Sequence, residues 1–163
     1  MTDVFASIAF YLFGLVAVGG AIGMIVARKL VHSAIFLVVS FLGVAAIYLL
    51  ARADFLAGVQ VLIYAGAIMI LMLFAIMLTP GQVEVASRLG QQLAAALVAA
   101  AFLVISAFTL TGANWPLAQT LSDKPTTEAI GQLILGKYVL PFEMASVLLL
   151  AAMVGAILIA RED

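Results

Sequence analysis

The sequence predicts an all-α, polytopic membrane protein with five transmembrane helices, and three observations support this fold class. Hydrophobic residues make up 67% of the 163 residues and charged residues only 9%, and the mean hydropathy is +1.32. A water-soluble domain of this length has no means of burying so much apolar surface. The apolar residues form nearly continuous runs of roughly 20 residues, which suits helical spans, whereas an outer-membrane barrel shows alternating strands of about 10 residues.

These runs define the expected elements of a single membrane domain, residues 1–163. The predicted spans are residues 5–26, 31–50, 55–78, 93–110 and 141–160. The first run is read as a retained span, because it is too long for a signal-peptide core and Asp3 stands where a basic segment is usual. A short amphipathic helix, Ala129 to Leu135, is expected between the last two spans, with Ile130, Leu133 and Ile134 on one face. Thr126-Thr127-Glu128 is expected to begin it.

Small residues within the spans predict close helix packing. Gly19 and Gly23 are four residues apart in the first run, and Ala152, Gly155 and Ala156 lie together in the fifth. Such spacing lets the backbones of two membrane helices approach each other. Because five helices offer few partners for these faces, we expect the chain to need other subunits for stability.

Basic residues outside the spans predict the orientation. Lys and Arg number four on the side of Arg28 and Arg161 and three on the side of Arg52 and Lys137. Positive charge favours the cytoplasmic side of a membrane. The bias therefore predicts an N-terminus outside the cell and a C-terminus in the cytoplasm.

The third run, Phe55 to Leu78, has the most unusual sequence. It contains no charged residue, and as a helix it would be roughly 36 Å long, which exceeds the hydrocarbon core of about 30 Å. Tyr64 and Gly66 stand together in its middle; α-helical periodicity puts Gln60 on the face of Tyr64, and Gly66 and Met69 on another. A polar face at this depth should meet protein or water. The simpler alternative is that Tyr64 makes one interhelical hydrogen bond and has no further role.

The chain is poor in residues that carry chemistry. It has no cysteine and one histidine, so we expect no metal site, no cofactor-binding residue and no catalytic residue of its own. The net charge of −1 gives no reason to expect a nucleic-acid partner. Within the spans Glu143 is the only Asp, Glu, Lys or Arg. In the first turn of the last helix it is best explained as a carboxylate at the membrane interface that the helix dipole favours. Any proton relay therefore needs titratable groups from a partner.

Two segments resemble a known family. ADFLAGVQVLIYAGAIMILMLFAIML, residues 53–78, and KYVLPFEMASVLLLAAMVGAILIAR, residues 137–161, are similar to spans of subunit J of the proton-pumping NADH–quinone oxidoreductase (respiratory complex I), the counterpart of mitochondrial NADH dehydrogenase chain 6. A third, weaker match begins at Arg28, although Lys29-Leu30 stands where the family often has Asn-Pro.

The resemblance implies a function for the third span. In the family this span carries a π-bulge, here expected at Tyr64 to Met69, whose conversion to α-helix gates a water path towards carboxylates of a neighbouring subunit. The gate candidates that it implies are Tyr64, Gly66, Ala67, Ile68, Met69 and Met72. Gln60 and Glu143 are expected as structural or interface residues from the sequence pattern itself, not from the resemblance.

The resemblance also implies partners and a location. The expected partners are other membrane-arm subunits, especially the small subunit K and the subunit that holds the quinone site (designated H), together with the lipid bilayer. The chain would be a non-catalytic subunit in the bacterial inner membrane, and NADH, FMN, iron–sulfur clusters and quinone would be bound elsewhere in the enzyme.

Two other functions remain open at the level of sequence. The chain could be the homologous subunit of a cation/proton antiporter or of a membrane-bound hydrogenase. It could also be a structural membrane scaffold without a switching helix. Tolerance of substitution at Gly66 would favour the scaffold.

Overall fold

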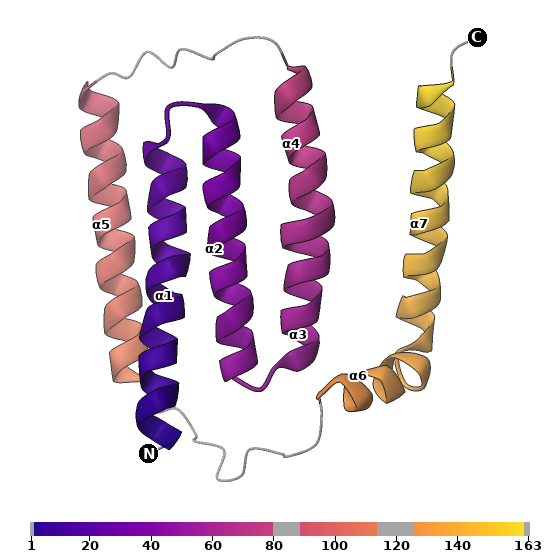
Figure 1. Ribbon diagram of the computed structural model, residues 1–163, viewed down its shortest axis with the longest axis horizontal. Coiled ribbons are helices and arrows are strands. Elements are labelled where there is room, and N and C mark those ends of the chain that lie inside the picture. The colour runs from indigo at the N-terminus through magenta and orange to yellow at the C-terminus, as the bar shows by residue number, and fades with distance from the viewer. Residues whose placement is uncertain (1, 80–88, 114–125, 162–163) are drawn as a thin grey trace. The chain divides into compact units, whose positions relative to one another are not determined.

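The computed structural model describes residues 2–79, 89–113 and 126–161, and these residues are almost entirely helical, with no strand among them (Figure 1). The elements are α1 (Thr2–Val26), α2 (Leu30–Leu50), α3 (Asp54–Val59), η1 (Gln60–Ile68), α4 (Met69–Leu78), α5 (Leu89–Gly112), α6 (Thr126–Leu135) and α7 (Val139–Ala160). The chain forms two compact units, one of residues 1–79 with 123–163 and the other of residues 80–122.

Five helical stretches are long and apolar enough to cross a membrane, as the sequence predicts. They are Val4–Val26, Leu30–Leu50, Asp54–Leu78, Leu93–Gly112 and Val139–Ala160. The five-span helical fold is therefore confirmed. The third stretch is not one regular helix, because α3, η1 and α4 follow one another without a break and η1 is a π-helix.

Helices α1 and α2 form a tightly packed hairpin (Figure 1). The buried Ser40 hydroxyl donates a hydrogen bond to the Ala17 carbonyl, with 2.8 Å between the oxygens. A Cβ on Gly43 would lie 2.7 Å from the Ala17 nitrogen, and a Cβ on Gly20 would lie 2.7 Å from the Ser40 nitrogen. Neither glycine has space for a side chain, so the two backbones can meet only because these positions are glycine.

Of the two glycines of the first span predicted to allow close helix packing, only Gly23 packs against α2. Gly23 does face α2, where a Cβ would meet the ring of Phe36 at 2.6 Å. A Cβ on Gly19 would have nothing within 4 Å, so this glycine does not take part in the packing of α1 on α2. Its neighbour Gly20 occupies the crossing point instead, because a rotation of one residue about the helix axis moves the contact to a different face.

Helix α2 is the element against which the third span packs. Helix α2 contacts α3, η1 and α4 in turn. Helix α7 packs differently: among the described elements it contacts only α6. Helix α6 in turn contacts α3 as well as α7. Helix α2 therefore lies along the whole length of the third span.

The amphipathic helix begins where the sequence predicts, whereas the last span begins two residues earlier than predicted. Helix α6 starts at Thr126; Ile130 and Ile134 are half-buried as an apolar face requires, but Leu133 is exposed. Helix α7 starts at Val139, two residues before Pro141. Glu143 consequently lies in the second turn of the helix, where the dipole of the first turn acts on it less than predicted.

Candidate functional site

The candidate site is the π-helical segment η1 in the middle of the third span. It comprises nine residues, Gln60–Ile68. At its end the Met69 N–H donates to the carbonyls of Gly66 and of Tyr64, the latter five residues earlier, which is the hydrogen-bond step of a π-helix. The segment overlaps the expected bulge, but it begins four residues before Tyr64 and ends at Ile68.

Most of the predicted gate residues belong to this segment. Tyr64, Gly66, Ala67 and Ile68 lie within η1, while Met69 and Met72 lie in the first turns of α4. Gln60 is the first residue of η1. Glu143 is apart from them on α7, where it is exposed and its carbonyl accepts a hydrogen bond from the Ser146 hydroxyl at 2.7 Å.

Gly66 has little space for a side chain in this backbone. A Cβ at this position would lie 3.2 Å from the carbonyl oxygen of Val61, five residues earlier, which is closer than most real Cβ contacts. By contrast, Gly58 in α3 has nothing within 4 Å of its Cβ position. The π-helical backbone thus favours glycine at position 66.

Gln60, the first residue of η1, and Met69, the residue that follows η1, are both buried. Gln60 is 7% exposed and Met69 is 1% exposed. In an α-helix nine residues make about 2.5 turns, so positions 60 and 69 would lie on opposite faces. Here both are covered by protein, and the wider turns of a π-helix change the rotation of Met69 about the axis relative to an α-helix. The assignment of Gln60 and Met69 to different faces rests on α-helical periodicity, which does not hold through the π-helical segment η1.

The ring of Tyr64 packs against Phe41 of α2. The ring centroids of Tyr64 and Phe41 are 5.8 Å apart and the rings are inclined by 76°, an edge-to-face contact. Tyr64 remains 45% exposed. Among the residues that the structure describes, no partner hydrogen-bonds its hydroxyl. Phe41 is not among the predicted site residues, since a phenylalanine in an apolar run has no distinguishing pattern.

A cavity of about 160 Å³ lies beside α4. Met72 and Ile76, one turn apart on α4, line one side of it. The other lining residues come from the α1–α2 hairpin; they are Met24, Leu30, Ser33, Ala34 and Leu37. The Ser33 hydroxyl donates to the Met24 carbonyl, so its polar group is satisfied within the hairpin. The far half of the third span thus borders space that no side chain fills.

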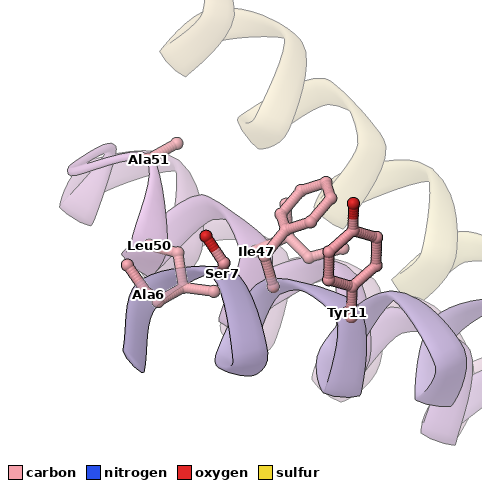
Figure 2. Close-up of a pocket in the computed structure, with 7 residues that line it drawn as sticks. Ala6, Ser7, Tyr11, Ile47, Leu50 and Ala51 are labelled. Atoms are coloured by element: carbon pink, nitrogen blue, oxygen red, sulfur yellow. The ribbon is translucent and has the colours of Figure 1, made fainter. Parts of the chain in front are cut away.

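A larger open cavity, about 370 Å³, lies at the other end of the hairpin (Figure 2). Ser7 and Tyr11 of α1 direct their hydroxyls to the same side, and Ile47 and Leu50 of α2 also line the cavity (Figure 2). None of the predicted site residues lines this cavity. Over the described parts of the chain, no group of three or more His, Asp or Glu side chains is placed to hold a metal ion.

Comparison of the sequence with known proteins identifies its family. Residues 20–159 match the family described as NADH-ubiquinone/plastoquinone oxidoreductase chain 6. The chain is 38% identical to NAD(P)H-quinone oxidoreductase chain 6 of Synechocystis over 96% of its own length and 81% of that protein. It is 36% identical to F(420)H(2) dehydrogenase subunit J of Methanosarcina mazei, covering 94% of this chain and 90% of the relative. The chloroplastic NAD(P)H-quinone oxidoreductase subunit 6 of Zygnema circumcarinatum is also 36% identical, over 88% and 86% of the two chains.

The resemblance seen in the third and fifth spans therefore extends over nearly the whole sequence. The protein is a multi-pass membrane protein, and its relatives are named as subunits of NAD(P)H-quinone oxidoreductases and of an F(420)H(2) dehydrogenase. It belongs to the NADH-ubiquinone/plastoquinone oxidoreductase chain 6 family.

Proposed function

We propose that this chain acts as subunit J of a proton-translocating NADH–quinone oxidoreductase, in which its third span gates a water path. The observation that carries the proposal is the π-helical segment Gln60–Ile68 within a span that has no charged side chain. A π segment inside a membrane helix is an irregularity that frequently marks a functional site. The carboxylates at the end of the path would belong to the small neighbouring subunit K, and the subunit with the quinone site would lie at its other end.

The proposed gate works by a change of helical phase. In the π form Gln60 and Met69 are both covered by protein. Conversion of η1 to α-helix would place these two positions on opposite faces. If α3 stays fixed, Met69 and the rest of α4 turn about the helix axis, which replaces one set of side chains by another along the path. The chain transfers no proton itself; it controls whether water molecules can occupy the path.

The packing of α4 is compatible with such a rotation. The cavity of about 160 Å³ beside Met72 and Ile76 provides space on the side of the hairpin. Close-packed interiors resist movement because every side chain already has neighbours. A helix that borders a void can turn with fewer collisions.

The chain is proposed to be non-catalytic. NADH oxidation, FMN, the iron–sulfur clusters and the quinone headgroup site are assigned to other subunits. The relatives carry names with different electron donors, NAD(P)H in one case and F(420)H(2) in another. This variation supports a role of the subunit in a membrane step that such enzymes share, rather than in donor oxidation.

The proposed location is the bacterial inner membrane, with the N-terminus outside and the C-terminus in the cytoplasm. The support is the excess of one basic residue on the side of Arg28, Lys29, Arg88 and Arg161. A reporter fused after Asp163 should be active only in its cytoplasmic form. A periplasmic signal at this position would reverse the orientation.

The test of the gate is Gly66→Val in the assembled complex. The added Cβ would press on the Val61 carbonyl in the π form, and the β-branched side chain is stiff. The population of the α form should therefore rise relative to the π form. A shift of about 1.4 kcal/mol changes the ratio of the two forms tenfold. In membrane vesicles driven by NADH, we expect proton uptake per NADH oxidised to fall while the amount of assembled complex stays normal.

The matched control is Gly58→Val, just before the π segment in the same span. Its Cβ meets nothing within 4 Å, so pumping should be retained. Full assembly and normal pumping by Gly66→Val would show that the span does not gate, and the scaffold function would then be preferred.

A further inference from the structure

Phe41 of α2 is the aromatic residue that the third span meets at the centre of its π segment. Its ring lies edge-to-face against Tyr64, with 5.8 Å between the ring centroids and 76° between the planes. Tyr64 is the middle residue of the nine in η1. The contact therefore lies at the middle of the segment whose hydrogen bonding would change between the π and α forms.

Helix α2 is a suitable support because it is held firmly to α1. Ser40, the residue before Phe41, is buried and donates its hydroxyl hydrogen to the Ala17 carbonyl at 2.8 Å. Two residues after Phe41, Gly43 lies against the Ala17 backbone so closely that no Cβ would fit. Successive residues on a helix are about 100° apart, so Ser40 and Gly43 face α1 while Phe41 faces the third span.

The contact depends on the register of η1. Each residue of a π-helix advances by a smaller angle about the axis than in an α-helix, because a π turn holds more residues. Conversion to α-helix would change the rotation of Tyr64 relative to Val59, and its ring would no longer meet the same edge of Phe41. Edge-to-face geometry is specific for orientation. The pair should thus favour the π form over the α form.

We propose that Phe41 is a positioning residue that holds Tyr64 in the π register of the third span. The inference rests on the proposed gate function and adds to it the residue outside the span that sets the balance between the two forms. Loss of one aromatic pair of this kind should change the ratio of the forms roughly two- to tenfold.

The test is a double-mutant cycle in the assembled complex, measured as proton uptake per NADH oxidised in membrane vesicles and normalised to the amount of complex. Phe41→Leu removes the ring but keeps an apolar side chain, and Tyr64→Leu removes the partner ring. We expect each single change to lower pumping at least twofold. The double variant should pump no less than Tyr64→Leu alone, because the ring contact that Phe41→Leu removes is already lost in that variant. Phe41→Tyr retains a ring and should restore pumping.

Phe74→Leu is the matched control, since Phe74 is 60% exposed on α4 of the same span and should tolerate the change. Additive losses in the double variant, or equal behaviour of Phe41→Leu and Phe74→Leu, would overturn the positioning role. So would failure of Phe41→Tyr to restore pumping per assembled complex.

The outcomes separate this inference from the proposed function. Impaired pumping in Gly66→Val with normal pumping in Phe41→Leu would leave the gate standing and reject the role of Phe41. Normal pumping in Gly66→Val with a coupled loss in the Phe41 and Tyr64 variants would reject the register switch, and with it the π-register role of Phe41, and would leave only a ring contact that pumping requires.

Discussion

Single residues in the third span have separable roles, and Tyr64 shows this most clearly. Its ring contacts Phe41, whereas its hydroxyl is the only polar group on the side chain. Tyr64→Phe removes the hydroxyl and keeps the ring contact. Assembly should be unchanged and pumping should fall less than in Gly66→Val, because only the interaction with water is weakened. Vesicle pumping assays on both variants check the order, and a stronger defect in Tyr64→Phe would contradict it.

Two adjacent glycines in α1 offer a second comparison at this scale. A Cβ at Gly20 would lie within 3 Å of the Ser40 backbone, whereas a Cβ at Gly19 would meet nothing within 4 Å. Gly20→Val should therefore force α1 and α2 apart at a cost of about 1–3 kcal/mol. We expect much less assembled complex in membranes for Gly20→Val and a normal amount for Gly19→Val. Equal amounts would show that the hairpin does not pack in this way.

The elements of the fold follow from the sequence more closely than the site does. The ends of the five spans lie within a few residues of the predicted positions, because charged residues and turns mark the membrane boundaries. The extent of the π segment could not be predicted in the same way. Its nine residues are apolar except for Gln60 and Tyr64, and a period of 3.6 residues assigns Gln60 and Met69 to different faces, although both are buried.

The contact partner of Tyr64 also could not be predicted from the sequence. Phe41 is in another span, and no local pattern specifies which of the many apolar side chains of α2 faces η1. The packing of Ser40 and Gly43 against Ala17 determines its orientation, and this packing is a property of the tertiary structure. Gly66, by contrast, can be recognised in the sequence itself, because glycine inside a helix lowers helix stability relative to alanine and is expected only where the structure requires it.

At the scale of elements, the cavity beside α4 makes a prediction. Ala34 lines it and is 3% exposed. Ala34→Ile should fill part of the space and hinder rotation of α4, so pumping should fall in a complex that still assembles. Ala75→Ile places the same bulk on an exposed position of α4 outside the cavity and serves as the control. Normal pumping by Ala34→Ile would mean that the cavity is not used.

At the scale of the whole molecule, the chain exposes apolar surface that other proteins or lipid must cover. No residue of α7 is buried, and among the described elements α7 contacts only α6. Membrane helices associate through close packing of small residues, and α7 carries such residues. Expressed without other subunits, the chain should be degraded or should aggregate in mild detergent. A monodisperse, thermally stable monomer on size-exclusion chromatography would argue against an obligate subunit.

Segment Gln60–Ile68 should exist in two registers during the enzyme cycle if the third span is a gate. Electron cryomicroscopy of the intact complex, at rest and during turnover with NADH and quinone, measures this directly by showing the hydrogen-bond partner of the Met69 N–H. We predict two classes of particles: one with the bond to the Tyr64 carbonyl and Met69 buried, as in this structure, and one with α-helical bonding and Met69 turned to another face. A single π register in every class, at rest and in turnover, would contradict the gate.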